Sequence, residues 1–440
     1  MSNVSNKYLP INAKKFRESV YWGKLPSDYK KTFNVISEVL PFRVNSFYLE
    51  NLIDWDAGID DPLFQLVFPQ AGMLADSQFS RISQALSGSR TELLNVVRDV
   101  RTELNPHPSG QAFNIPTIND QKISGIQHKY SETALFFPSA GQSCHAYCSF
   151  CFRWAQFVGD TEDRFQSRDV RQLIDYLKIH PEITDILITG GDSMIMPTRI
   201  LERYIQPLLD ETHITTIRLG SKALTYWPQR FTKDEDADDL MRLFEKITAS
   251  GKHLAFMAHI NHPRELAPKE TRHAIKRILA TGAVIRTQAP LLKHVNDKPE
   301  DWIDLWTQQV QLGCIPYYMF VERDTGPKQY FEVPLVECYD IFQKAYSKVS
   351  GLARSVRGPI MSATEGKVCI DGIIEINDQK YISLQYLQAR NPSLCRKPFL
   401  AIYDPNAVWF DQLECLTLPH DDGLQKKKVF HNRIRSVEII

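Results

Sequence analysis

Residues 133–154 read TALFFPSAGQSCHAYCSFCFRW, a short apolar run followed by three closely spaced cysteines. The apolar run is typical of a buried strand, and we expect Cys144, Cys148 and Cys151 to lie on the loop after it. Their spacing leaves a disulfide, a zinc site and an iron–sulfur cluster open. A structural zinc site needs a fourth ligand, and His145 directly follows the first cysteine, an awkward position in the same tetrahedron. A cluster with three thiolates leaves one iron open to another ligand.

The composition narrows the setting of this motif. The chain has 440 residues, 43% hydrophobic and 24% charged, with 52 Lys plus Arg against 52 Asp plus Glu. Zero net charge provides no basic field for nucleic acid or an anionic membrane, no apolar run reaches the roughly 18–20 residues of a membrane span, and the N-terminus lacks the apolar core of a signal peptide. We therefore expect a cytoplasmic protein, where a tight cysteine group more often binds metal or does redox chemistry.

Strand-like and helix-like patterns alternate between residues 133 and 346. The predicted strands are 133–138, 184–191, 215–220, 253–260, 283–292 and 314–321. The predicted helices are 167–179, with Ser167 as N-cap, and 238–251, 269–282, 299–313 and 333–346. Connected β/α units imply parallel strands with right-handed crossovers. We predict an α/β fold with an open or partial, TIM-type (β/α)6 barrel, closure with eight units being the alternative, and a site at the carboxyl ends of the strands.

Two further regions flank the predicted barrel at 131–350. Residues 1–130 form a mainly helical N-terminal region, with helical spacing over 77–104 and a loop rich in Pro, Gly and Asn over 105–120. Residues 351–440 form a mixed α/β extension, in which 367–378 and 397–405 resemble short strands and the basic run 424–433 is typical of exposed surface.

The segment CHAYCSFC (144–151) resembles the CxxxCxΦC signature of radical S-adenosylmethionine (SAM) enzymes, with Phe150 in the aromatic position. The resemblance implies a [4Fe–4S] cluster on the three cysteines, SAM on the open iron, a 5′-deoxyadenosyl radical and a flavodoxin- or ferredoxin-type electron donor. Gly190, Gly191 and Asp192 end the second predicted strand, where that superfamily binds the methionine amino group. The competing interpretation is a non-catalytic iron–sulfur or zinc protein.

Seven further segments resemble the lysine 2,3-aminomutase family in order and spacing: 40–44, 61–70, 186–194, 217–231, 258–266, 287–297 and 316–320. The resemblance runs from about residue 40 to residue 367. That family moves an amino group between adjacent carbons and uses pyridoxal phosphate (PLP) as its carrier. It implies a small-molecule substrate, an amino acid or a derivative of one, and a homo-oligomer.

The same resemblance assigns roles to individual side chains. Arg153 would bind the substrate carboxylate, for which a guanidinium is well suited, and Asp297 would bind a substrate amino group. The residues that would line the cofactor pocket are Ser221, Lys222, His259 and Gln288, with Lys222 in place of an arginine on a phosphate. The alternatives are ordinary structural roles, such as a surface arginine, a turn-capping aspartate and a core histidine.

The part of the sequence that would hold PLP departs from the family. Lys367 falls in register with the lysine that forms the Schiff base, but residues 362–365 (SATE) replace the glycine run before it, and Ile360 replaces a substrate-binding aspartate. Lys129 and Thr133 stand where arginines are expected. Two hypotheses stay open: an aminomutase that uses PLP on a substrate other than free lysine, and a PLP-independent radical SAM enzyme that abstracts hydrogen for epimerisation, dehydrogenation or elimination.

Overall fold

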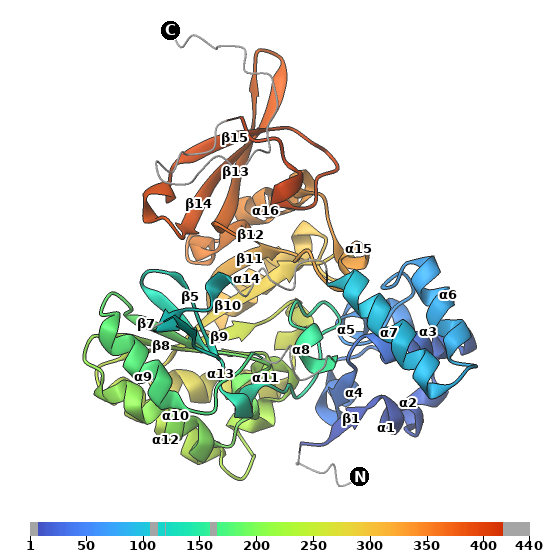
Figure 1. Cartoon of the computed structure of the whole chain (residues 1–440), viewed down its shortest axis with the longest axis horizontal. Helices are drawn as coiled ribbons and strands as arrows, with labels where there is room; N and C mark the ends of the chain where they lie inside the picture. The colour runs from blue at the N-terminus through green and yellow to red at the C-terminus, as the bar shows by residue number, and fades with distance from the viewer. Residues whose placement is uncertain (1–7, 106–112, 119, 159–164, 417–440) are drawn as a thin grey trace.

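The computed structural model describes residues 8–105, 113–118, 120–158 and 165–416, and one large mixed sheet dominates it (Figure 1). This sheet has eleven strands in the order β15-β14-β13-β12-β11-β10-β9-β8-β7-β6-β5. Its parallel strands are β6 (Thr133–Phe136), β7 (Asp185–Ile188), β8 (Thr216–Ser221), β9 (His253–His259), β10 (Val284–Leu291), β11 (Ile315–Val321) and β12 (Arg357–Ser362). The first six correspond to the six predicted strands, so the α/β class is confirmed.

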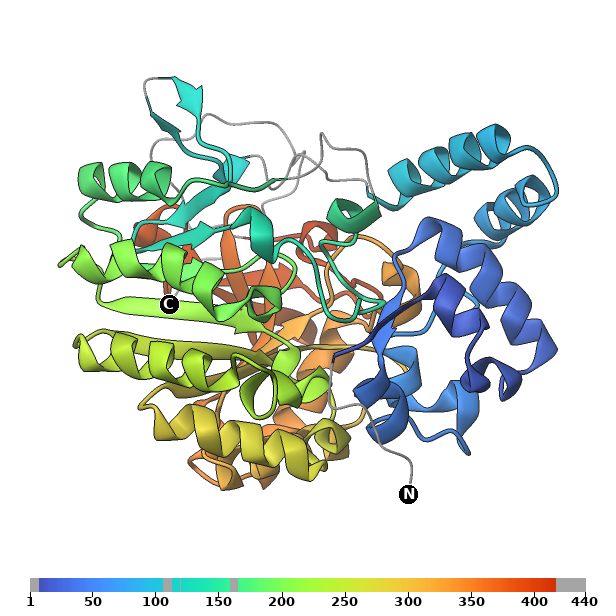
Figure 2. The same ribbon diagram turned by 90° about the horizontal axis from the view of Figure 1, so that it is seen from below.

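Helices connect consecutive parallel strands, and Figure 2 shows them arranged along one side of the sheet. They are α9 (Val170–Ile179), α10 (Thr198–Asp210), α12 (Ala237–Ala249), α13 (Lys269–Ala280), α14 (Pro299–Gln311) and α16 (Leu335–Lys348). The short helices α8 (Ala155–Val158), α11 (Ala223–Tyr226) and α15 (Lys328–Phe331) lie in the loops after the strands. Each long helix buries one apolar face, as α12 does with Leu240, Phe244 and Ile247.

Two local expectations about these helices were wrong. Asp169 rather than Ser167 is the N-cap of α9, because its carboxylate accepts a hydrogen bond from the amide of Arg171. Helix α10 was not predicted; it contains Pro207, which obscures a helical pattern.

The sheet continues into both flanking regions. At one end β5 (Ile126–Tyr130) pairs antiparallel with β6, and at the other β13 (Gly366–Ile376), β14 (Gln379–Ala389) and β15 (Pro398–Ile402) pair antiparallel in turn. The predicted strands at 367–378 and 397–405 correspond to β13 and β15, whereas the basic run 424–433 lies outside the described residues. The edge strand β5 approaches the far end of the parallel strands, since the ammonium of Lys129 on β5 donates to the carbonyl of Ala363 just after β12. The sheet is therefore strongly curved.

The N-terminal helices form a second core beside the sheet (Figure 1). They are α1 (Ala13–Arg17), α2 (Val20–Gly23), α3 (Ser27–Val39), α4 (Ser46–Asn51), α5 (Pro62–Gln65), α6 (Asp76–Ala85) and α7 (Arg90–Leu104), with the small sheet β1 (Pro10–Asn12)–β2 (Arg43–Asn45). The hairpin β3 (Thr117–Ile118)–β4 (Gln121–Lys122) instead packs through Ile118 on the core of the large sheet. The predicted helical segment 77–104 corresponds to α6 and α7. Ala146, Phe150 and Trp154 belong to this second core, so it joins the helices to the cysteine loop. Among the described residues, no helix is long and apolar enough to cross a membrane.

Candidate functional site

The three motif cysteines lie on the loop between β6 and α8, and the N-terminal region holds this loop by its backbone. The amide of Tyr147 donates to the carbonyl of Arg43 at 2.9 Å, and the amide of Ser149 donates to the carbonyl of Leu66 at 2.9 Å. The guanidinium of Arg43 donates to the Ser143 hydroxyl and to the Cys144 carbonyl, both at 2.8 Å. All eight cysteines of the chain carry free thiols.

The surroundings of the thiols fit a negatively charged cluster. Burial raises the pKa of each thiol, to about 12 for Cys148 and about 11 for Cys151. A different cation opposes this rise at each cysteine: Arg43 at Cys144, Lys222 at Cys148 and Arg153 at Cys151. Metal binding requires thiolates, and nearby cations stabilise them. Within the described ranges, no three His, Cys, Asp or Glu side chains are arranged around one metal ion; in a [4Fe–4S] cluster, each thiolate binds a different iron.

Gly190 and Gly191, at the end of β7, let this strand pack directly against the start of the cysteine loop. The amide of Gly191 donates to the carbonyl of Gly141 at 2.9 Å. A Cβ on Gly191 would lie 2.4 Å from the Ser143 carbonyl oxygen, and one on Gly190, whose φ is +149°, would lie 2.2 Å from the Gln142 side chain. A side chain at Gly191 would require a shift of the loop backbone, and one at Gly190 would require the Gln142 side chain to move and a φ that favours glycine.

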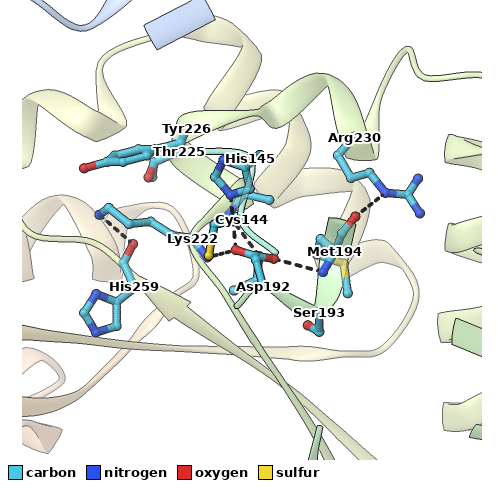
Figure 3. Close-up of polar contacts among 12 residues, drawn as sticks. Cys144, His145, Asp192, Ser193, Met194, Lys222, Thr225, Tyr226, Arg230 and His259 are labelled. Carbon is cyan, nitrogen blue, oxygen red and sulfur yellow. Dashed lines mark hydrogen bonds and ion pairs between the residues drawn. The ribbon is translucent and has the colours of Figure 1, made fainter. Parts of the chain in front are cut away.

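Asp192 ties the cysteine loop to the end of β8 (Figure 3). Its Oδ2 lies 3.1 Å from Nε2 of His145 and accepts from the amide of Lys222 at 2.8 Å. Its Oδ1 accepts from the Ser221 hydroxyl at 2.7 Å and from the amide of Met194 at 2.9 Å. Burial alone would raise the pKa of Asp192, but the contact with His145 and these hydrogen bonds hold it below its ordinary value. Direct contact of Asp192 with SAM stays a prediction.

Lys222 and His259 belong to a buried network beside Cys148. The Lys222 ammonium lies 3.0 Å from Glu265 Oε2 and donates to Oδ1 of Asn261 at 2.8 Å and to the carbonyl of His259 at 3.3 Å (Figure 3). The His259 ring stacks on Phe150 with centroids 6.3 Å apart, and burial lowers its pKa to about 3, so the ring is neutral. The structure thus gives Lys222 protein partners rather than an open phosphate site.

The curved sheet borders one cavity of about 950 Å³. Every strand from β5 to β14 contributes at least one lining residue: Lys129, Leu135, Leu187, Arg218, Met257, Gln288, Tyr318, Ser362, Lys367 and Gln388 are examples. Of the predicted site residues, Arg153, Gln288 and Lys367 line it together. Asp297 is not among the lining residues, and its carboxylate accepts from the amide of His294 at 3.0 Å in a turn.

Lys367 is placed as a nucleophilic lysine would be. Its ammonium donates to Oε1 of Gln388 at 2.6 Å and lies 5.1 and 5.0 Å from the rings of Tyr130 and Tyr318. Burial, followed by repulsion from Arg218 and other cations, lowers its pKa to about 7. A large fraction of the amine is therefore neutral near pH 7, as Schiff-base formation requires.

Arg153 presents an unused hydrogen-bond donor at the cavity wall. It is 9% exposed, its guanidinium carbon lies 4.3 Å from the centroid of the Phe137 ring, and its Nη1 has no hydrogen-bond partner. Burial lowers its pKa to about 10, so the group stays charged. A buried guanidinium with a free N–H fits an anionic ligand group.

Several basic residues of this cavity were not predicted from the sequence, among them Arg218, Arg323 and Arg390. Arg218 lies within a predicted strand and pairs with Asp185 at 2.7 Å. Arg323 follows the end of β11 by two residues, where the rule that sites lie at strand ends would have found it. Arg390 follows β14, a strand that was not predicted, so no signal pointed to it.

No protein-family model matches this chain. A protein of Aquifex aeolicus named "Putative L-lysine 2,3-aminomutase" is 32% identical over 402 residues, which cover 91% of this chain and 95% of that protein. The L-lysine 2,3-aminomutase of Clostridium subterminale is 27% identical over 250 residues, 57% of each chain. Among solved structures, a radical SAM methyltransferase from Sphaerobacter thermophilus is similar at a TM-score of 0.36 and 15% identity, covering 53% of this chain and 69% of that one, a likeness too low to support a conclusion.

These relatives and the cysteine motif place the chain among the radical SAM proteins, a class of enzymes. Within that class, it belongs to the lysine 2,3-aminomutase family. Membership implies a [4Fe–4S] cluster and SAM as cofactors.

Proposed function

We propose that the protein catalyses an aminomutase-like 1,2-rearrangement on an amino acid or amino-acid derivative. Cys144, Cys148 and Cys151 would hold the [4Fe–4S] cluster, with SAM beside Gly190–Asp192. When bound, the cluster and SAM supply a 5′-deoxyadenosyl radical that abstracts hydrogen from the substrate. The supporting observation is that Arg153, two residues after Cys151, lines the same cavity as Lys367.

The protein's own residues would bind and shield the substrate in this cavity. The free Nη1 of Arg153 is suited to a substrate carboxylate, and strands β5 to β14 would surround the substrate on the side of the sheet. We propose that this curved sheet is a partial (β/α)6 barrel at 131–350 with 1–130 and 351–440 as extensions. Its support is that successive strands all face one cavity.

We propose that the enzyme also uses PLP, with Lys367 as the Schiff-base lysine. PLP, when bound, would carry the migrating amino group. The lowered pKa of Lys367 and the aromatic rings beside it support this over PLP-independent hydrogen abstraction. The proposal assigns no substrate contact to Asp297, because that side chain caps a turn away from the lining residues.

Three parts of the proposal rest on composition and family resemblance alone. They are a flavodoxin- or ferredoxin-type reductant, a homo-oligomer, and a place in the cytoplasm without a nucleic-acid or membrane partner.

The decisive experiment measures SAM cleavage. Anaerobically reconstituted full-length protein, given dithionite and SAM, is expected to release 5′-deoxyadenosine, and Cys148→Ala is expected to lose both iron and cleavage. Cys314→Ala is the matched control, since Cys314 is a buried cysteine just before β11, at the opposite end of that strand from the site. Wild-type protein with a full cluster that releases no 5′-deoxyadenosine would overturn the proposal.

A further inference from the structure

Three basic side chains from separate parts of the chain converge on the short loop after β12. The carbonyl of Ser362 accepts from Nη1 of Arg323 at 3.1 Å, and the carbonyl of Ala363 accepts from the ammonium of Lys129. The carbonyl of Thr364 accepts from Nε of Arg390 at 3.1 Å. This is the segment that replaces the family's glycine run. Three successive carbonyls are thus each held by a different cation.

These contacts leave much of the positive charge uncompensated. The cavity is lined by six basic residues, Lys129, Arg153, Arg218, Arg323, Lys367 and Arg390, and by three acidic ones, Asp324, Glu365 and Asp411. Arg218 is paired with Asp185 outside the lining, and Lys367 is partly neutral near pH 7, so the positive charge comes mainly from Lys129, Arg153, Arg323 and Arg390. The carboxylates of Glu365 and Asp411 are exposed, and that of Asp324 lies 3.5 Å from Nε of Arg323. Burial, followed by repulsion from Arg390 and Arg323, lowers the pKa of Lys129 to about 8. Like charges held this close favour an anion between them.

A buried hydroxyl without a hydrogen-bond partner lies at the same cavity wall as these cations. The hydroxyl of Tyr130 is buried, 8% of the residue being exposed, it lines the cavity next to Lys129, and it has no hydrogen-bond partner. Arg323 and Arg153 share one ring, with guanidinium carbons 5.7 and 5.3 Å from the centroid of Phe152. The cationic wall therefore continues from the loop to Arg153.

We propose that Lys129, Arg323 and Arg390 form an anion-binding site that receives a phosphate or carboxylate group of the ligand in this cavity, next to the site at Arg153. The inference rests on the proposed function, because that function makes the cavity the place of cofactor and substrate. The anion has two sources: the phosphate of PLP, or an acidic group on the substrate side chain. In either case, this positively charged wall would not bind an ammonium group on the substrate side chain. Ile360 is buried and apolar, so it cannot bind such a group either.

Two matched ligand pairs test the site in full-length protein by isothermal titration calorimetry. PLP and pyridoxal differ only in the phosphate, and L-glutamate and L-glutamine differ only in side-chain charge. Wild type is expected to bind the anionic member of one pair about ten- to a hundredfold more tightly than the other member. This ratio corresponds to the free energy of one hydrogen bond to a charged group. Discrimination within the PLP pair assigns the site to the cofactor, and discrimination within the glutamate pair assigns it to the substrate.

Variants of Arg323 and Arg390 test whether these side chains cause that discrimination. Arg390→Gln and Arg323→Gln are expected to bring the ratio to within about threefold of unity, while Arg390→Lys keeps most of it. Arg354→Gln is the control, because Arg354 also donates to a loop carbonyl, that of Val349 at 3.1 Å, and is not among the lining residues. The inference would be overturned if wild type bound the two members of each pair equally tightly. It would also be overturned if both Gln variants discriminated between the members as wild type does. Release of 5′-deoxyadenosine is measured separately, so failure of the proposed function is recognised independently.

Discussion

The ammonium of Lys222 lies 3.0 Å from Oε2 of Glu265, in an ion pair that is buried at both ends. The other carboxylate oxygen accepts from the amides of Asn261 and His262, at 2.8 and 3.2 Å. The pair therefore joins the end of β8 to the segment after β9. Lys222 is also the cation that opposes the rise in the pKa of Cys148, so one side chain serves both the fold and the cluster site.

Removing one partner of this pair should be costly. Lys222→Met leaves the Glu265 carboxylate buried without its cation and is expected to lower the free energy of unfolding by about 3–5 kcal/mol, measured by denaturant titration. The double variant Lys222→Met with Glu265→Gln should recover much of the loss, because glutamine keeps an oxygen for the two amides. A single variant as stable as wild type would contradict a structural role for the pair.

The second prediction concerns Gly191, just after β7. A methyl group on Gly191 meets the backbone of Ser143 at 2.4–2.8 Å, which no side-chain movement relieves. Gly191→Ala is expected to displace the cysteine loop, cost about 1–3 kcal/mol or more and reduce the iron bound after reconstitution. Gly351→Ala is the control, because a Cβ there meets nothing within 4 Å. Full iron content in Gly191→Ala would show that the loop tolerates the shift.

Lys367 should make stability depend on pH. Its pKa is about 7 in the folded protein against 10.5 ordinarily, so the unfolded chain binds more protons between these values. Wild-type stability should therefore gain from this residue as pH rises above about 7, and its charged form should cost most below that value. Lys367→Met should be more stabilising at pH 6 than at pH 9, by about 2 kcal/mol, in thermal or denaturant unfolding. The exposed Lys397→Met is the control, and an advantage for Lys367→Met that does not change with pH would contradict the lowered pKa.

The same group should react with PLP in a pH-dependent way. Borohydride reduction of protein given PLP is expected to modify Lys367, identified by peptide mass spectrometry. The yield should rise between about pH 6 and 8 and then level off, because the neutral amine is the reacting form. Lys367→Arg should abolish this adduct. An adduct on other lysines only would favour the PLP-independent alternative.

Much of the central fold could be predicted because most of the central parallel strands are short apolar runs separated by helical patterns. The runs at 184–191 and 314–321 each became a strand within those limits. The edge strand β5 and the antiparallel strand β14 could not be predicted in this way. Their inner faces carry residues such as Gln127, Lys129 and Gln388, which line the cavity and break the apolar pattern.

The candidate site was predictable only where residues are close in the sequence. The spacing of the motif cysteines, Cys144, Cys148 and Cys151, can be recognised in the sequence. The convergence of Lys129, Arg323 and Arg390 depends instead on the curvature of the whole sheet. The burial that gives Lys222 its partner in Glu265 is likewise a tertiary property. The sequence register predicts Lys222 as a phosphate ligand, which stays a prediction, but it gives no sign of the ion pair with Glu265.

The hydrogen bonds from the N-terminal region to the cysteine loop affect how the protein reaches its folded form. Arg43 and Leu66 hold the backbone of residues 143–149 from outside the sheet. A fragment beginning at residue 131 would keep the cysteines and the strands around them but lose one wall of the cluster pocket. Docking of the N-terminal helices would therefore complete the support of the cysteine loop, so both parts of the chain must be folded together before the loop is held in this conformation.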